Sequence, residues 1–61
     1  MNDPALNVAA FNGQLEFAKM LVEMDAELNV RGFGGRTALC HAISQGHEEV
    51  AAYLREVGAT E

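Results

Sequence analysis

Apolar residues recur at helical spacing in two separate parts of this 61-residue chain. Both sets occupy positions i, i+3, i+4 and i+7, and they comprise Phe17, Met20, Leu21 and Met24 in the first half and Val50, Tyr53, Leu54 and Val57 in the second. Residues three and four apart share one face of a helix, so each set predicts an amphipathic helix. A shorter segment rich in alanine and leucine precedes each set, at about 5–11 and 38–44, and predicts another helix.

The chain repeats itself with a period of about 33 residues, so that Ala5-Leu6 aligns with Ala38-Leu39. Across the 25 paired positions that start at Pro4 and end at Leu28, nine residues are identical to their counterparts in the second half. Their members in the first half are Ala5, Leu6, Ala9, Gly13, Glu16, Ala18, Leu21, Glu23 and Ala26. A fixed period of this length is typical of repeat proteins, in which each copy is one structural unit. We therefore assign residues of about 3–31 to a first copy and of about 32–61 to a second copy, within one mini-domain.

Turn-forming residues divide each copy into two helices. Gly13 and Gly46 separate the paired helices, because glycine reaches the left-handed conformation that ends a helix. Asp3 and Thr37 are expected to start the first helix of each copy. The segment 29–36, called the finger below, holds three glycines and predicts a turn-rich connection between the copies.

A repeat unit with a β-turn, two helices and a Thr-Pro-Leu-His-x-Ala signature at this period is the ankyrin pattern, and the chain resembles it over nearly its whole length. The matching residues are Leu6, Ala9-Ala10, Gly13, Leu15-Glu16, Leu21, Ala26 and Asn29 in the first copy, and Gly35-Arg36-Thr37-Ala38-Leu39, Ala42, Gly46-His47, Glu49-Val50, Leu54 and Gly58-Ala59 in the second. The resemblance implies an all-α fold of two stacked helix-turn-helix repeats joined by a glycine-rich β-turn finger.

Several residues depart from the ankyrin pattern. In the signature, Pro4 replaces the threonine of the first copy, Ala38 replaces the proline of the second, and Asn7 and Cys40 replace the histidine. Gly32 stands in place of the aspartate of the finger, and Asp25 in place of the glycine that ends the second helix of the first copy. These departures bring the usual threonine–histidine hydrogen-bond network into question and predict a softer fold.

Charge and composition narrow the classes of partner. The net charge of −5 argues against general affinity for nucleic acid or anionic membranes. Arg31 and Arg36 are the only charged residues between Leu28 and His47, so the finger is basic while the carboxylates elsewhere form a solvated face. The single cysteine, Cys40, excludes an internal disulfide, and no apolar stretch or leader marks a membrane span or secretory signal. We expect a cytoplasmic protein.

Candidate catalytic or metal-binding groups are weak. Cys40 and His41 are adjacent and would point about 100° apart on a helix, so they do not readily share a metal ion. His47 lacks the second histidine of a zinc-protease helix, and the finger lacks the lysine of a phosphate-binding loop. A packed core cysteine and a helix-capping histidine are the simpler interpretations, and we expect no cofactor.

The resemblance instead implies protein binding through the finger and the exposed face of each copy's first helix. The residues that this assigns to partner binding are Phe11, Asn12, Arg31, Phe33, Gly34, Arg36, Ser44 and Gln45. Phe33, between two arginines and flanked by glycines, has the composition of an interface hot spot. The predicted function is a non-catalytic protein-interaction module. The alternative is a small stand-alone acidic inhibitor of the immunity or anti-defence type, and an enzyme is a distant third.

The two ends of the predicted stack differ. Glu48 and Arg55 stand where the first copy has Leu15 and Val22, and such a polar outer face is typical of a terminal capping repeat, which predicts a natural C-terminus. The opposite end keeps apolar residues, including Val8 and the methionines of the first copy. Because three repeats are normally needed for stability, this end predicts a homodimer or a complex with another protein.

Overall fold

The computed structural model describes residues 4–61, apart from the side chain of Phe33, and folds them into four α-helices and one 3₁₀ turn. In chain order these are α1 (Ala5–Phe11), α2 (Leu15–Glu23), the turn η1 (Phe33–Gly35), α3 (Ala38–Ser44) and α4 (Glu48–Glu56). Residues 4–61 contain no strand. The prediction of an all-α fold made of two helix pairs is confirmed.

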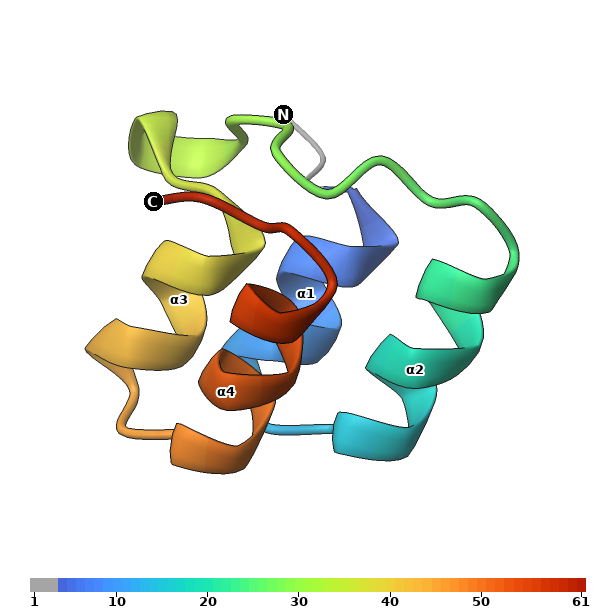
Figure 1. The fold of residues 1–61 in the computed structure, drawn as a ribbon. Helices are drawn as coiled ribbons and strands as arrows, with labels where there is room; N and C mark the ends of the chain where they lie inside the picture. The colour runs from blue at the N-terminus through green and yellow to red at the C-terminus, as the bar shows by residue number, and fades with distance from the viewer. Residues whose placement is uncertain (1–3) are drawn as a thin grey trace.

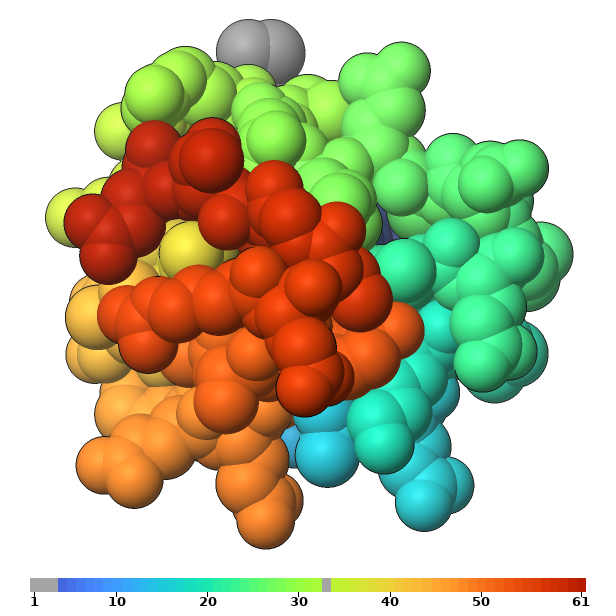
Figure 2. Space-filling view, viewed as in Figure 1, coloured from blue at the N-terminus to red at the C-terminus, as the bar shows by residue number. Residues whose placement is uncertain are grey.

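The two helix pairs stack side by side. Each pair forms a hairpin, and α1 packs against α3 while α2 contacts α4. Figure 1 shows the short turns of both hairpins at one end of the molecule, with the finger and the C-terminal segment at the other. In the space-filling view the outer helices α2 and α4 lie next to each other below the finger (Figure 2). The stack therefore has two ends, one formed by the first copy and one by the second.

Small residues hold the helices together. Ala9 and Ala10 of α1 and Ala38 and Ala42 of α3 are fully buried, and small side chains let packed helices approach closely. Buried leucine and valine side chains fill the remaining core, namely Leu6, Leu39, Val50 and Leu54. Helices of seven and nine residues are too short to be stable alone, so their stability comes from this packing.

The helix ends follow the predicted signals with one substitution. Thr37 precedes α3, and its Oγ1 accepts a hydrogen bond from the Cys40 backbone N–H at 3.3 Å, which confirms it as a helix start. Asp3 lies outside the described residues, and Pro4 precedes α1 without a side-chain capping bond. After α2 the chain turns through Asp25 at φ 67°, a left-handed conformation that the second copy makes with Gly58. An aspartate adopts it with a strain of roughly 1 kcal/mol.

Side-chain hydrogen bonds tie the finger and the C-terminal segment to the rest of the fold where the ankyrin signature is altered. The Nδ2 amide of Asn7, a fully buried side chain, donates to the carbonyls of Val30 at 3.1 Å and Arg36 at 3.2 Å. The Thr37 hydroxyl donates to the Thr60 carbonyl at 2.9 Å, and the Thr60 N–H donates to Asn29 Oδ1 at 2.7 Å. Asn7 thus fixes the finger to α1.

Candidate functional site

The finger is a closed turn. The Gly32 N–H donates to the Arg36 carbonyl and the Gly35 N–H donates to the Gly32 carbonyl, both at 2.9 Å. Gly34 and Gly35 have φ values of 71° and 73°, which residues with a Cβ rarely adopt. The Arg31 guanidinium donates to the Gly35 carbonyl at 2.9 Å, so part of its hydrogen-bonding capacity braces the turn. Arg36, the last residue of the finger, is exposed and adds a positive charge there.

A second group of predicted residues lies where α1 and α3 end. Phe11 is half-exposed, and its ring meets the buried His41 ring edge-on with centroids 5.6 Å apart. Asn12 follows α1, while Ser44 ends α3 and Gln45 follows it, and all three are exposed. Because α1 and α3 pack side by side, these residues belong to one end of the helix pair.

The predicted residues therefore form two groups and not one patch. Arg31, Gly34 and Arg36 precede α3, whereas Ser44 and Gln45 lie at its other end. The seven residues of α3 separate the groups by about 10 Å at 1.5 Å per residue. Phe33 belongs to η1, but its side chain lies outside the described part of the chain. A partner that contacts both groups must extend along the first helices.

Sequence reasoning assigned one residue near this region to the open end of the first copy and missed another. Val8, expected at that apolar end, is exposed one helical turn before Phe11. His41 is buried and supports the Phe11 ring. Its alignment with Val8 one repeat earlier gives no hint of that contact.

His47 connects the turns of the two hairpins. It directly precedes α4 but makes no side-chain capping bond to that helix. Its Nε2 lies 3.1 Å from the Phe11 carbonyl, and the ring sits over Gly13. Since a carbonyl only accepts, Nε2 carries the proton and donates. His47 thus caps the end of α1 in the other copy, and it fixes the turn that carries Phe11 and Asn12.

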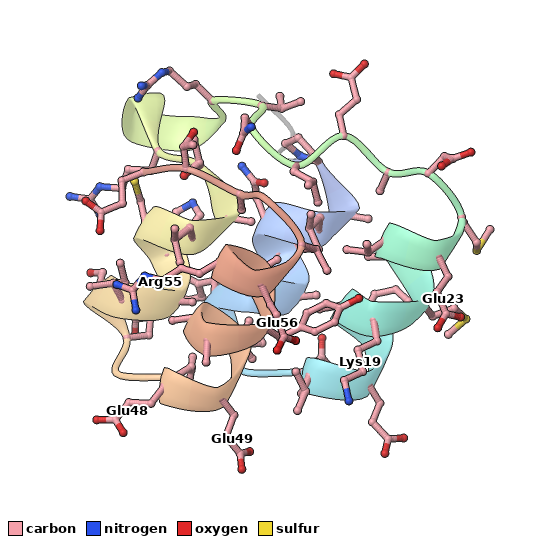
Figure 3. All side chains as sticks on the ribbon, in the orientation of Figure 1. Lys19, Glu23, Glu48, Glu49, Arg55 and Glu56 are labelled. Carbon is pink, nitrogen blue, oxygen red and sulfur yellow. The ribbon has the colours of Figure 1, made fainter. Side chains whose placement is uncertain are left out.

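Most charged side chains of the helices lie on α2 and α4. Figure 3 shows Lys19 and Glu23 on α2, and Glu48, Glu49, Arg55 and Glu56 on α4, projecting from the outer helices. Glu48 and Glu49 lie in the first turn of α4, where they interact favourably with the helix dipole. The Arg55–Glu61 pair, 3.9 Å apart and largely exposed, contributes little stability. The outer helices thus carry more carboxylates than cations, whereas the charged residues of the finger are both arginines.

Cys40 lies half-buried near the finger, not packed in the core as expected. Hydrogen bonds from the Thr37 side chain and backbone lower the pKa of its thiol, and they outweigh the opposing effect of burial. Thr37 Oγ1 is 3.3 Å from Cys40 Sγ and 2.9 Å from the Thr60 carbonyl, so its one proton is shared between two acceptors.

This lowered pKa predicts a difference between the folded and unfolded thiol. We expect the pH midpoint of Cys40 alkylation by iodoacetamide to lie lower in the native protein than in urea. Because the folded pKa is the lower one, the thiolate adds stability above the unfolded pKa, and this contribution is lost as pH falls through the folded pKa. Equal midpoints in the two states would contradict the Thr37 contacts.

Comparison with known proteins identifies the family of this fold. A family model described as ankyrin repeats (3 copies) matches residues 1–60. The chain belongs to the ankyrin-repeat family. Ankyrin repeats are protein–protein interaction modules and are generally non-catalytic. Among the described residues of this ankyrin-repeat chain, no helix has the length and apolar character needed to cross a membrane.

Three curated relatives contain a similar ankyrin segment. A rice protein, the probable E3 ubiquitin-protein ligase XBOS33, is 44% identical over 54 residues, covering 88% of this chain and 10% of the relative. Human protein phosphatase 1 regulatory subunit 27 is 40% identical over 55 residues, covering 90% of this chain and 36% of the relative. The Arabidopsis ADP-ribosylation factor GTPase-activating protein AGD4 is 39% identical over 54 residues, covering 88% of this chain and 7% of the relative. The ankyrin-repeat chain thus spans a minor part of each relative.

Proposed function

We propose that this ankyrin-repeat chain is a non-catalytic module that binds a partner protein through its finger and the exposed side of its first helices, without a metal or cofactor. The observation that carries the proposal is the rigid support of both residue groups. Hydrogen bonds from Arg31 and Asn7 hold the finger, and His47 holds the turn after α1. Groups that are fixed before binding lose less entropy on association. The single cysteine favours a reducing, cytoplasmic setting.

The surface suits a partner with an acidic and an apolar contact region. Arg31 and Arg36 supply positive charge at one end of α3, and Phe11 supplies a half-exposed ring at the other. Arginine and aromatic residues are enriched in interface hot spots. The human relative is named a regulatory subunit, which supports a role exerted through binding another protein.

Site-specific photo-crosslinking tests this surface. We expect a benzoylphenylalanine at Ser44 or Arg36 to capture the same partner from the source cells, whereas the same probe at Glu56 on α4 captures none of it. All three positions are exposed. Capture from Glu56 alone would contradict the proposal.

The captured partner then allows a quantitative prediction. Phe33→Ala and Arg36→Ala should each weaken binding by about 1–2 kcal/mol, or roughly five- to thirtyfold, without changing the unfolding midpoint. Arg55→Ala is the matched control, because this arginine is exposed on the outer helix α4. Isothermal titration calorimetry measures the affinities. An unchanged affinity with a lowered unfolding midpoint for Phe33→Ala would mean that Phe33 is structural.

A stand-alone acidic inhibitor, of the immunity or anti-defence type, is the second candidate. The net charge of −5 and the exposed carboxylates of the outer helices favour it. An inhibitor that acts through this acidic surface would bind a basic site on its target. In that case crosslinks arise from Glu49 and Glu56, and not from the finger.

A further inference from the structure

The end of the stack formed by the first copy is apolar and open. Four large apolar side chains of this end, called the first-copy end face below, are between 42% and 70% exposed: Val8 on α1, Phe17 and Met20 on α2, and Met24 just after it. Phe17, Met20 and Met24 follow helical spacing, so they share one side of α2. Large exposed apolar side chains gathered at one end of a fold indicate an interaction site.

The internal repeat shows what this face looks like when it is covered. Aligning the first copy with the second places Val8, Phe17, Met20 and Met24 on His41, Val50, Tyr53 and Val57. Val50 and His41 are only 2% and 4% exposed, and Tyr53 and Val57 are half-buried. His41 meets Phe11 and Tyr53 meets Lys19, so it is the first copy that covers these positions. The same face is thus closed in one copy and open in the other.

The first copy also shows what a suitable cover consists of. The fully buried Ala10 lets α1 approach α3 closely, and Leu15 and Val22 pack against the core from α2. Lys19 holds its ammonium group 5.7 Å from the centre of the Tyr53 ring. The cover therefore combines one small residue, two aliphatic residues and one cation.

Charge indicates that the open face fits the same kind of cover. Tyr53 lies between Glu49 and Glu56 on α4, and Met20 lies between Glu16 and Glu23 on α2 at identical helical spacing. Figure 3 shows Lys19 on α2 together with Glu49 and Glu56 on α4. A cation at the Lys19 position of a covering unit would accordingly lie over Met20, close to two carboxylates.

A second copy of this chain suits the face less well in either arrangement. In the head-to-tail arrangement, the covering surface would be the shallow groove at the other end of the stack. There the positions of Ala10, Leu15, Lys19 and Val22 are held, in that order, by Ile43, Glu48, Ala52 and Arg55. That contact would bury the Glu48 carboxylate and the Arg55 guanidinium, and it would have alanine in place of the cation at the Lys19 position. Face-to-face pairing of two copies would place Glu16 and Glu23 of one chain near the same residues of the other. Like charges oppose such a contact.

We propose that the first-copy end face docks the end of another ankyrin-type helix pair, one that presents alanine, two aliphatic residues and a lysine or arginine at the positions of Ala10, Leu15, Val22 and Lys19. This interaction uses a different surface from the finger and goes beyond the function proposed above. It covers the apolar side chains of α2 and adds a third pair of helices to a stack that has two.

The chain itself supplies a probe for this docking. In a donor variant, the other end of the stack would receive the covering residues of the first copy through Ile43→Ala, Glu48→Leu, Ala52→Lys and Arg55→Val. Its own first-copy end face would be blocked by Met20→Glu and Met24→Glu. All six positions are exposed. Sedimentation velocity of the donor mixed with the wild-type chain should give a one-to-one complex, with a Kd at least tenfold below that of wild-type self-association.

Matched changes in the wild-type partner locate the contact. Met20→Glu should weaken donor binding at least tenfold, while Ile43→Glu, at the opposite end and similarly exposed, should leave it unchanged. If the donor does not give a helical circular dichroism spectrum, a donor with only Glu48→Leu, Arg55→Val and Met20→Glu replaces it. A folded donor that does not bind overturns the proposal. Wild-type dimers that form as tightly as the mixed complex overturn it too, in favour of the homodimer expected from the sequence.

Discussion

Replacing Asn7 with aspartate is expected to remove a large part of the stability of the fold at neutral pH. The Asn7 amide is fully buried and donates to the carbonyls of both Val30 and Arg36. A carboxylate of the same shape has no proton to donate, so it would face two carbonyl oxygens with an uncompensated buried charge. The cost is about 3 kcal/mol or more. A chain of 61 residues has a total stability of only about 3–9 kcal/mol.

Asn29→Asp is the matched control for this change. Asn29 Oδ1 accepts a hydrogen bond from the Thr60 N–H, and its side chain is exposed. Aspartate keeps that acceptor, so the free energy of unfolding should change by about 0.5 kcal/mol or less. Urea unfolding followed by circular dichroism compares both variants with the wild type. If the Asn7 variant were as stable as the Asn29 variant, the two carbonyl contacts would not hold the finger.

Acid should partly rescue the Asn7→Asp variant. A protonated carboxyl group has one O–H, which would donate to one of the two carbonyls and remove the buried charge. The stability difference from the wild type, measured at each pH, should therefore shrink as pH falls. A difference independent of pH would indicate that the variant fails for a reason other than the lost donor.

The sequence predicted the local elements of this fold because their signals are local and occur twice. The segments 5–11 and 38–44 are helices as expected, and Gly13 and Gly46 adopt φ values of 71° and 74° between the paired helices. Each signal lies within a few residues of the element that it determines. The internal repeat then duplicates the assignment and fixes the stacking order.

The contacts that join the copies were beyond sequence reasoning. Asn7 was visible only as a departure from the ankyrin signature, and its acceptors lie 23 and 29 residues away. His47 reaches the Phe11 carbonyl over 36 residues, and no periodicity connects these two positions. Pairings over such separations require the positions of both copies. The division of the predicted binding residues into two groups, by contrast, follows from the length of the helix that the sequence predicts at about 38–44.

The contact between copies also explains why equivalent glycines are expected to differ in their tolerance of alanine. Gly13→Ala should lower the free energy of unfolding by about 2–3 kcal/mol, against about 1 kcal/mol for Gly46→Ala. Both residues have a left-handed backbone, so both variants acquire the same strain. Only at Gly13 would the new Cβ meet a neighbour, with the Cε1 and Nδ1 atoms of His47 at 2.7 Å, while no atom lies within 4 Å of a Cβ at Gly46. The His47 ring would have to move and release the Phe11 carbonyl, a loss of about 1 kcal/mol in addition to the packing.

Removing the ring tests this cause directly. His47→Ala alone should cost about 1 kcal/mol, through the lost hydrogen bond to Phe11. In the double variant with Gly13→Ala the clash is absent, so the combined loss should be about 1–2 kcal/mol smaller than the sum of the two single losses. Urea unfolding of the four chains gives this coupling energy. Additive losses would mean that the strained backbone at Gly13, and not the ring of His47, is responsible for the effect of the alanine, and Gly46→Ala would then be equally destabilising.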